Sequence, residues 1–397
     1  MAAPVKGPRP ASRVRIVLGG GFLAVYPQGG GHWSVFLQYL LGLRALGHDV
    51  FWLEVMRSSG NPGRDRYLIR AFFQRMARYG FKGCCALLLH RPGAGPASLS
   101  SARAFGMSKR RIQTIVQEAD LLWNFCWAIR EPLLSLFRRR ALVDLDPGHL
   151  QVSAMGQETD IQAHDVFLTV GLRMDAPGCE VPALGVRWRP FLPIVYLPMW
   201  ESAAAPGRRA PFTSVTHWTW EELQLNGRVY SVSKRSAYFK YVEIPRRTGR
   251  PFELAVHLHP KDTTGDRELL KGYGWRLIHP YRAVRSPAAY QRFIRNSRAE
   301  FACPKPIHVQ LRTGWFSDRS AAYLASGRPV LAEDTGFSGY LPAGEGLLAF
   351  QNLEEAVAGV ERIDARYAFH SRAARAFAEE FLDFRRNLGA MLAICLA

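Results

Sequence analysis

The chain has 397 residues, of which 48% are hydrophobic and 21% charged, a balance that excludes large-scale disorder. Its length exceeds one ordinary core, so two domains of about 150 to 200 residues are expected. The formal net charge is +19, and only eight of the 52 basic residues are lysines. Two explanations stay open: anionic partners, including a membrane surface, or arginine enrichment by GC-rich coding.

The six cysteines show no CxxC spacing and no histidine at zinc distance, which indicates reduced thiols in a cytoplasmic protein. No run of 18 apolar residues is present, so no membrane span is expected. Arg13 and Arg15 interrupt the apolar N-terminal stretch, which favours a short disordered lead over 1–12 rather than a signal peptide. Basic residues are scattered, which argues against a specific nucleic-acid partner.

A Rossmann-like domain is predicted over 13–197. A buried strand over 14–18 leads into glycine clusters, followed by an amphipathic helix over 33–46 and a strand over 49–54. The glycines allow another backbone to approach closely, so they are predicted to form a cleft loop. They are Gly20, Gly21, Gly29, Gly30 and Gly31.

Two candidate catalytic residues lie in this half. His32 stands at the head of the first helix, where a neutral imidazole can accept a proton from a hydroxyl; capping or loop packing is the alternative. Asp120 precedes a strand over 121–123. A further strand over 141–145 ends in Asp144-Leu145-Asp146-Pro147-Gly148, which reads as a turn or as carboxylates on the ligand-facing edge of a parallel sheet.

A proline-rich linker is predicted over 198–211, before a second Rossmann-like domain over 212–365 and a helical segment over 366–397. In the second domain, Gly227 and Arg228 are expected in a loop that leads to a helix carrying Lys234. The alternation of Ile307, Val309 and Leu311 with polar residues predicts a strand there.

The stretch that follows carries the strongest signature. Ser317 is a predicted N-cap for a helix over 318–326, and a strand over 330–332 runs into an acidic turn. A helix N-terminus with hydroxyls and an arginine suits a phosphate, and carboxylates accept hydrogen bonds from ribose or sugar hydroxyls. The alternative is ordinary capping and turn chemistry. The candidate donor-binding residues here are Gly314, Trp315, Ser317, Asp318, Arg319, Ser320, Glu333, Asp334, Thr335 and Gly336.

Two segments, 27–50 and 314–336, resemble the opening loop and the donor-binding half of GT-B glycosyltransferases of the bacterial group 1 type. The resemblance implies an α/β fold of two Rossmann-like domains facing across a cleft. It also implies a nucleotide-sugar donor on the C-terminal domain, an acceptor of unknown identity on the other, and no metal or other cofactor.

The resemblance also suggests individual roles. Arg228 and Lys234 are similar to the family's phosphate-binding pair, with a spacing one residue longer. His32 matches the base of inverting members, with Asp120 as its orienting carboxylate. The two glutamates of many retaining members are absent, because Ala322 precedes Tyr323 and no acid lies near Tyr340. The stereochemical outcome therefore stays open.

The function expected is transfer of a sugar from a nucleotide diphosphate. Two alternatives remain: a nucleotide-sugar epimerase of the same fold, and a non-catalytic protein that binds glycans or nucleotides.

Overall fold

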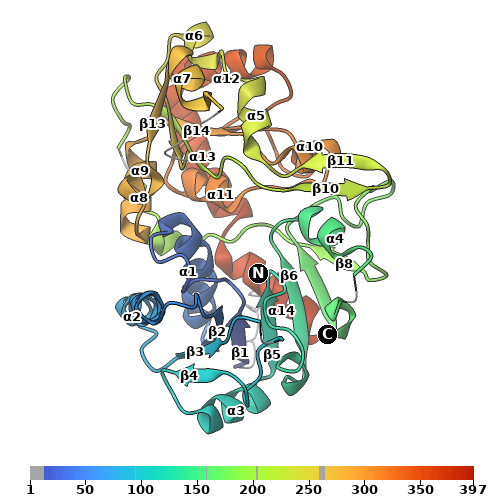
Figure 1. Cartoon of the computed structure of the whole chain (residues 1–397). Coiled ribbons are helices and arrows are strands. Elements are labelled where there is room, and N and C mark those ends of the chain that lie inside the picture. The colour runs from blue at the N-terminus through green and yellow to red at the C-terminus, as the bar shows by residue number, and fades with distance from the viewer. Residues whose placement is uncertain (1–12, 94, 158, 203, 259–263) are drawn as a thin grey trace, which may run out of the picture.

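The computed structural model describes residues 13–93, 95–157, 159–202, 204–258 and 264–397. It contains two parallel-stranded sheets flanked by helices, one in each half of the chain, and Figure 1 shows them as a lower and an upper domain. This confirms the predicted fold class of two Rossmann-like domains with C-terminal helices.

The first sheet has the strand order β4-β3-β2-β1-β5-β6-β7-β8, with every pair parallel except β3 and β4. Its buried strands are rich in Val, Leu and Phe, as expected for a parallel sheet covered on both faces. The strands are β1 (Arg15–Gly19), β2 (Asp49–Arg57), β3 (Cys85–His90), β4 (Arg103–Phe105), β5 (Leu121–Phe125), β6 (Arg140–Asp144), β7 (Val166–Thr169) and β8 (Trp188–Pro190).

The second sheet has the order β13-β12-β9-β14-β15-β16 and is parallel throughout. A separate antiparallel hairpin, β10–β11, follows β9, which is the first strand of this sheet in chain order. The strands are β9 (Phe212–Thr216), β10 (Glu222–Leu225), β11 (Arg228–Ser231), β12 (Phe252–Val256), β13 (Trp275–Ile278), β14 (Ala299–Ala302), β15 (Val330–Glu333) and β16 (Leu347–Phe350).

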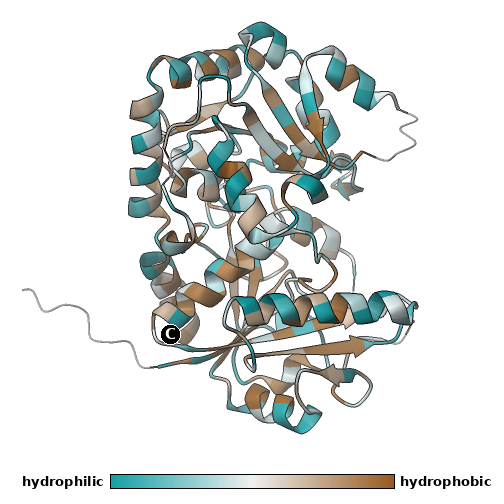
Figure 2. Ribbon diagram, turned by 90° about the vertical axis from the view of Figure 1, so that its left-hand side faces the viewer, coloured by the Kyte–Doolittle hydropathy of each residue, from teal (hydrophilic) through white to brown (hydrophobic). Residues whose placement is uncertain are grey.

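Helices cover both sheets. They are α1 (Gly30–Ala45), α2 (Pro62–Arg78), α3 (Lys109–Glu118), α4 (His149–Ala154), α5 (Lys234–Lys240), α6 (Ile244–Thr248), α7 (Asp266–Gly272), α8 (Pro280–Ala283), α9 (Pro287–Asn296), α10 (Pro306–Gln310), α11 (Asp318–Ala325), α12 (Leu353–Ala365), α13 (Tyr367–Phe381) and α14 (Phe384–Leu396). In Figure 2 the strands of the lower sheet are mostly hydrophobic, whereas the long helix beside them, α2, carries hydrophilic residues along its outer face.

The C-terminal helices divide between the two domains. Phe377 and Ala378 of α13 pack into the core of the second domain. The chain then crosses back, and Phe384, Leu388 and Met391 of α14 join the core of the first domain. The C-terminal segment therefore packs on both domains and is not a separate unit. Among the described helices, none has the length and hydropathy needed to cross a bilayer.

The strand predicted over 307–311 is wrong, because these residues form α10. Pro306 occupies the first helical turn, where its missing N–H costs nothing, and the buried pair Ile307 and Leu311 has helical i, i+4 spacing. The strand that precedes this region is β14, and all four of its residues are buried.

Candidate active site

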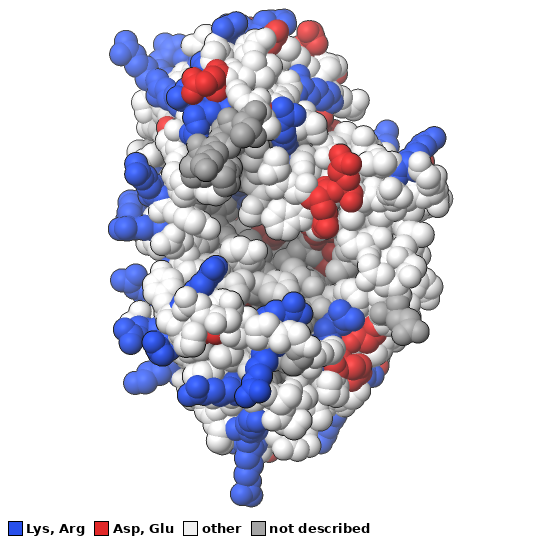
Figure 3. Space-filling model, viewed as in Figure 1, with Lys and Arg blue, Asp and Glu red and all other residues white. Residues whose placement is uncertain are grey.

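The carboxyl ends of both parallel sheets face a cleft between the domains, and Figure 3 shows a hollow between the upper and lower halves of the molecule. In open α/β sheets this edge is where ligands bind. The residues that follow β1, β5 and β6 in the first domain, and β9, β14 and β15 in the second, therefore define the candidate site.

One of the predicted glycine clusters forms a contact between the domains. The N–H of Gly30 donates a hydrogen bond to the carbonyl of Val284 (2.9 Å). A β-carbon at Gly30 would lie 2.3 Å from the carbonyl oxygens of both Val284 and Ser286. The chain thus has glycine where the second domain's backbone packs against the first turn of α1. Gly29 and Gly31 flank this contact, and Tyr290 lies against Gly31.

The other predicted glycines pack within the first domain. Gly20 has a φ of +91° and leaves no space for a β-carbon, which would lie 2.3 Å from the carbonyl of Phe125. Gly21 accommodates the indole of Trp52, and its carbonyl contacts Nε2 of His32 at 2.5 Å. These glycines directly follow β1, and Gly21 contacts His32.

Asp146, two residues beyond β6, contacts basic residues of both domains. Its carboxylate forms ion pairs with Lys305 of the second domain and with His149 of its own domain (2.9 Å). Although burial acts against ionisation, the charge of Lys305 and hydrogen bonds from His149 and His308 hold the pKa of Asp146 well below its usual range. Nε2 of His149 lies 2.9 Å from Glu221 of the second domain. Asp146 therefore links the domains at the edge of the cleft.

Trp315 continues this contact between the domains. Its ring stacks on His308 with 4.7 Å between centroids, and its Nε1 donates to the carbonyl of Leu145 (3.2 Å). The backbone of Trp315 pairs with Gly171, and Arg173 donates to the carbonyl of Thr313 (3.1 Å). The predicted donor-binding residues Gly314 and Trp315 thus lie where the two domains meet.

Three cationic side chains, those of Lys234, Lys305 and Arg319, lie close together near Trp315. Burial, together with the charges of Arg319 and Lys305, lowers the pKa of Lys234 to about 7. The ammonium group of Lys234 lies 5.7 Å from the centroid of the Trp315 ring. Among the residues that the structure describes, no carboxylate pairs with Lys234. The same cations, after burial, lower the pKa of His217, which follows β9.

The amino end of α11 lies at this cluster. Ser317 caps the helix, as the sequence predicts. The Ser317 hydroxyl accepts a hydrogen bond from the N–H of Arg319 (3.1 Å), and the Ser320 side chain is buried. The guanidinium of Arg319 pairs with the fully buried Glu300 and donates to the carbonyl of Val215 (2.6 Å). Its Nη2 has no hydrogen-bond partner within the described part of the chain. Arg319 is therefore fixed by the protein and keeps one donor free.

Asp318 adds an acid at the same helix end. Burial raises the pKa of Asp318 to about 7, and its Oδ1 atom has no partner among described residues. Its charge also acts on Tyr39 of α1, which places this end of α11 beside the first domain.

The acidic turn after β15 is satisfied internally. Oε1 of Glu333 accepts hydrogen bonds from Lys240 (2.8 Å) and Tyr241 (2.6 Å). Asp334 accepts from Gly336 and Ser338, and so stabilises its own turn. Thr335 donates to the carbonyl of Trp315 (2.7 Å), and Gly336 has a φ of +94° beside Arg173. These contacts hold the turn in place, while a role in binding hydroxyls remains a prediction.

Two predicted pairs of site residues are separated by the structure. Asp120 accepts a hydrogen bond from the N–H of Arg15 (2.8 Å) at the amino end of β1, the opposite edge of the sheet from His32. Asp120 therefore does not orient His32. Arg228 is the exposed first residue of β11 and not part of a loop before α5. At about 3.3 Å per strand residue, the hairpin holds it away from Lys234.

The sequence patterns do not single out Lys305, His308 or His217. For Asp146 they leave two alternatives, a turn residue or a carboxylate on the ligand-facing edge of the sheet. Each follows a parallel strand or lies in the first turn beyond it. Lys305 escaped because the strand was assigned to 307–311 instead of β14, so the strand-end rule was applied at the wrong place. The same rule, applied to Ala299–Ala302, identifies Lys305.

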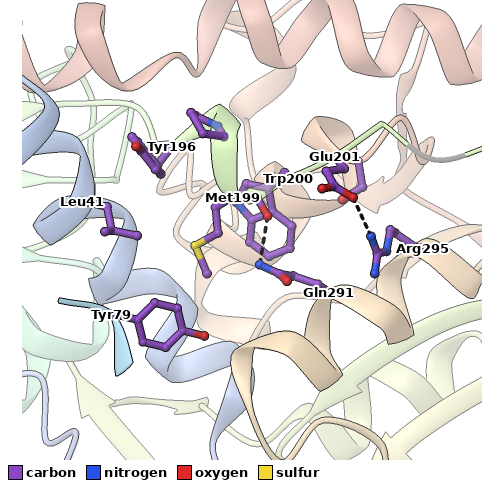
Figure 4. Close-up of a pocket in the computed structure, with 10 residues that line it drawn as sticks. Leu41, Tyr79, Tyr196, Met199, Trp200, Glu201, Gln291 and Arg295 are labelled. Atoms are coloured by element: carbon purple, nitrogen blue, oxygen red, sulfur yellow. Dashed lines mark hydrogen bonds and ion pairs between the residues drawn. The ribbon is translucent and has the colours of Figure 1, made fainter. Parts of the chain in front are cut away.

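A second hollow, of about 470 Å³, lies between α1, α9 and the segment over 196–201 (Figure 4). Tyr196, Pro198, Met199, Trp200 and Glu201 line it together with Leu41 of α1, and Gln291 of α9 donates to the carbonyl of Met199 (2.9 Å). Ser326, at the carboxyl end of α11, also lines it, whereas the charged cluster lies at the amino end of that helix. This cavity is therefore distinct from the charged cluster. The described residues form no group of three His, Cys, Asp or Glu side chains suited to a metal ion.

No protein-family model and no curated protein sequence matches the chain. Solved structures do match it. Sucrose-phosphate synthase from Thermosynechococcus elongatus has a TM-score of 0.57 at 12% identity, covering 96% of this chain and 98% of that one. HepE from Anabaena, in complex with UDP and glucose, has 0.57 at 10%, covering 96% and 100%. AviGT4, a glycosyltransferase involved in avilamycin A biosynthesis, has 0.53 at 13%, covering 96% of each. The chain thus has the GT-B fold of these proteins along nearly its whole length.

Proposed function

We propose that this protein is a glycosyltransferase that moves a sugar from a nucleotide diphosphate sugar to an acceptor. The observation that carries the proposal is Lys234, a partly buried lysine flanked by two other cations and paired with no carboxylate in the described chain. Such an arrangement is costly unless an anion completes it. A diphosphate supplies that anion at the amino end of α11.

In the proposed reaction, the bond between the anomeric carbon and the diphosphate oxygen breaks as the acceptor oxygen forms its bond to that carbon. The electron pair of the breaking bond remains on the diphosphate. Lys234, Lys305 and the free Nη2 donor of Arg319 stabilise the growing negative charge, which is electrostatic stabilisation of the transition state. Side chains supply this stabilisation in the proposal, and the amides at the start of α11 add to it.

His32 is the proposed acceptor base. Burial lowers the pKa of His32 to about 4, so the ring is neutral near pH 7. Its Nε2 contacts the carbonyl of Gly21, an acceptor only, which assigns the proton to Nε2 and leaves Nδ1 to accept. The acceptor's hydroxyl proton passes to Nδ1, and no carboxylate among the described residues orients the ring.

The proposal is supported by the fold, since the HepE structures of the same architecture contain UDP, UDP with glucose, or UDP-glucose. Calorimetry with UDP, GDP, ADP and dTDP tests the donor site directly. At least one nucleotide is expected to bind, with affinity lowered tenfold or more in Lys234→Ala, because a charge-assisted hydrogen bond contributes about 1.5–3 kcal/mol. The exposed Lys271→Ala in the same domain is the matched control.

Turnover separates the transferase from its alternatives. Incubation with a nucleotide sugar and no acceptor, followed by NMR, is expected to show slow hydrolysis by water. An isomerised sugar would instead identify an epimerase. Nucleotide binding without any turnover across acceptor mixtures would identify a binding protein, and no binding by any nucleotide would refute the proposal.

A further inference from the structure

A third hollow, a cavity of about 630 Å³, opens in the first domain where β2 and β3 end. It lies between these strand ends and the segment over 101–109 that leads into α3. Only β2 separates β3 from β1. Gly19, the last residue of β1, is level with Leu53 of β2 and Ala86 of β3, so the cavity residues Leu89 and His90 lie three and four residues farther along the sheet. At about 4.8 Å between neighbouring strands and about 3.3 Å per residue, the cavity begins roughly 15 Å from the end of β1, where Gly21 and His32 lie.

The charges that line this cavity are all positive. Arg91, Arg103 and Lys109 line it, and no aspartate or glutamate does. Within the described residues, none of these three cations forms an ion pair. The neighbouring carboxylate of Asp65 is already occupied by the hydroxyls of Ser58 and Ser59. The cavity therefore has an unbalanced positive charge.

Two of the three cations are held in place by other contacts. The guanidinium of Arg103 lies over the ring of Phe105, 4.8 Å from its centroid, and Nζ of Lys109 donates to the carbonyl of Ser100 (2.8 Å). His90, the last residue of β3, also lines the cavity. Its Nδ1 is buried, with no hydrogen-bond partner in the described structure. A ligand oxygen could accept a hydrogen bond from this nitrogen, or a ligand hydroxyl could donate one to it, according to the tautomer of the ring.

The remaining lining combines the apolar side chains of Leu89, Ala102, Ala104 and Met107 with three serines, Ser58, Ser101 and Ser108. A ligand that fits this cavity therefore combines an anionic group with an uncharged body. Three cations without a carboxylate suit a group of more than one negative charge, such as a phosphate, which carries about −1.5 to −2 near pH 7. Arginine forks match its oxygen geometry.

We propose that this cavity binds a phosphate group carried by the acceptor, with the acceptor's reactive hydroxyl reaching His32 in the cleft. This inference rests on the proposed glycosyltransferase function, because it names the class of substrate for the same site. The acceptor is then a phosphorylated molecule whose hydroxyl and phosphate are separated by roughly 15 Å, the combined span of two strand spacings and three to four strand residues.

The test measures binding without the donor, so its outcome does not depend on turnover. Glucose 6-phosphate, which is too short to reach His32 and so probes the phosphate subsite alone, and glucose are titrated into the whole protein by calorimetry. Phosphatidic acid vesicles are compared with phosphatidylcholine vesicles by co-sedimentation. The cavity variant is Arg91→Ala/Arg103→Ala. The control is Arg110→Ala/Arg111→Ala, which removes the same charge from α3 residues outside the cavity lining.

A phosphate-dependent interaction is expected in at least one arm, weakened tenfold or more in the cavity variant and unchanged in the control. Binding of glucose 6-phosphate supports a soluble acceptor, and binding of phosphatidic acid alone supports a lipid headgroup. UDP affinity should be equal in all three proteins, which shows that the donor domain is intact. Equal weakening by both variants, or no dependence on phosphate in either arm, overturns the proposal.

Discussion

Nε2 of His308 in the second domain lies 3.2 Å from Oδ1 of Asp146 in the first. The pair connects the carboxyl end of β6 to α10, and the stacked Trp315 extends the contact toward Lys234. Domain contact and the cationic cluster thus depend on the same few residues. A change at Asp146 should therefore affect both stability and donor binding.

Asp146→Asn should lower the free energy of unfolding by roughly 1 to 2 kcal/mol, since it leaves Lys305 without its counter-ion and solvent screens part of the loss. Asp165→Asn is the matched control. The two carboxyl side chains are equally exposed (36%), but Asp165 pairs with Arg140 within one domain. Thermal unfolding should show the larger shift for Asp146→Asn, with weaker UDP binding in that variant alone. Equal shifts and equal affinities would contradict the link between the domains.

Much of the first domain follows from its sequence. The predicted order of strand, glycine loop, helix and strand is observed as β1, α1 and β2, because long apolar runs broken by glycine have few other solutions. The donor-side helix was also predicted within one residue, since Ser317 and Gly327 mark its two ends.

The failures arose where local patterns were ambiguous. The residues over 307–311 alternate on paper, but Pro306 and the i, i+4 pair of Ile307 and Leu311 favour a helix. The β10–β11 hairpin was missed although Asn226-Gly227, with φ values of +50° and +75°, is a strong type I′ turn pair. Contacts between domains, such as Lys305 with Asp146, depend on tertiary placement that no local pattern encodes.

The sequence predicts Arg319 only as a donor-binding residue. The structure adds a structural contact, because Arg319 neutralises Glu300, which is fully buried. Arg319→Met should therefore destabilise the protein by about 3–5 kcal/mol, the usual effect of leaving a buried charge unpaired. Adding Glu300→Gln should recover most of that loss in a double-mutant cycle measured by chemical unfolding. A double variant no more stable than Arg319→Met would show that the ion pair is not the cause.

Gly30 and Gly31 provide a comparison of two adjacent glycines in one helical turn. Gly30→Ala should destabilise the protein by about 1–3 kcal/mol and push the domains apart, because its β-carbon would overlap the backbone of Val284 and Ser286. Gly31→Ala meets the ring of Tyr290 at an ordinary 3.4 Å and should be nearly neutral. Thermal unfolding measures stability, and small-angle scattering measures the separation of the domains. Equal behaviour of the two variants would show that the close approach at Gly30 is not limiting.

The pKa of Lys234 gives the donor site a defined pH dependence. Below about pH 7 the ammonium is charged before the nucleotide arrives, so affinity for a nucleoside diphosphate should be independent of this lysine's titration. A bound diphosphate favours the charged form and raises the pKa of Lys234 further. As pH rises from 7 to 9, binding must therefore take up a proton, and affinity should fall by up to tenfold per pH unit.

The control for this dependence is Lys234→Arg, because a guanidinium stays charged throughout the range. Its affinity should change little between pH 7 and pH 9, where the phosphate itself, with a second pKa near 6, is already ionised. Calorimetry in two buffers of different ionisation enthalpy counts the protons directly. Uptake approaching one proton at pH 8 is expected for the natural protein and none for the variant. The same uptake in both proteins would assign the titration to another group, such as Asp318 at the head of α11, whose pKa is about 7.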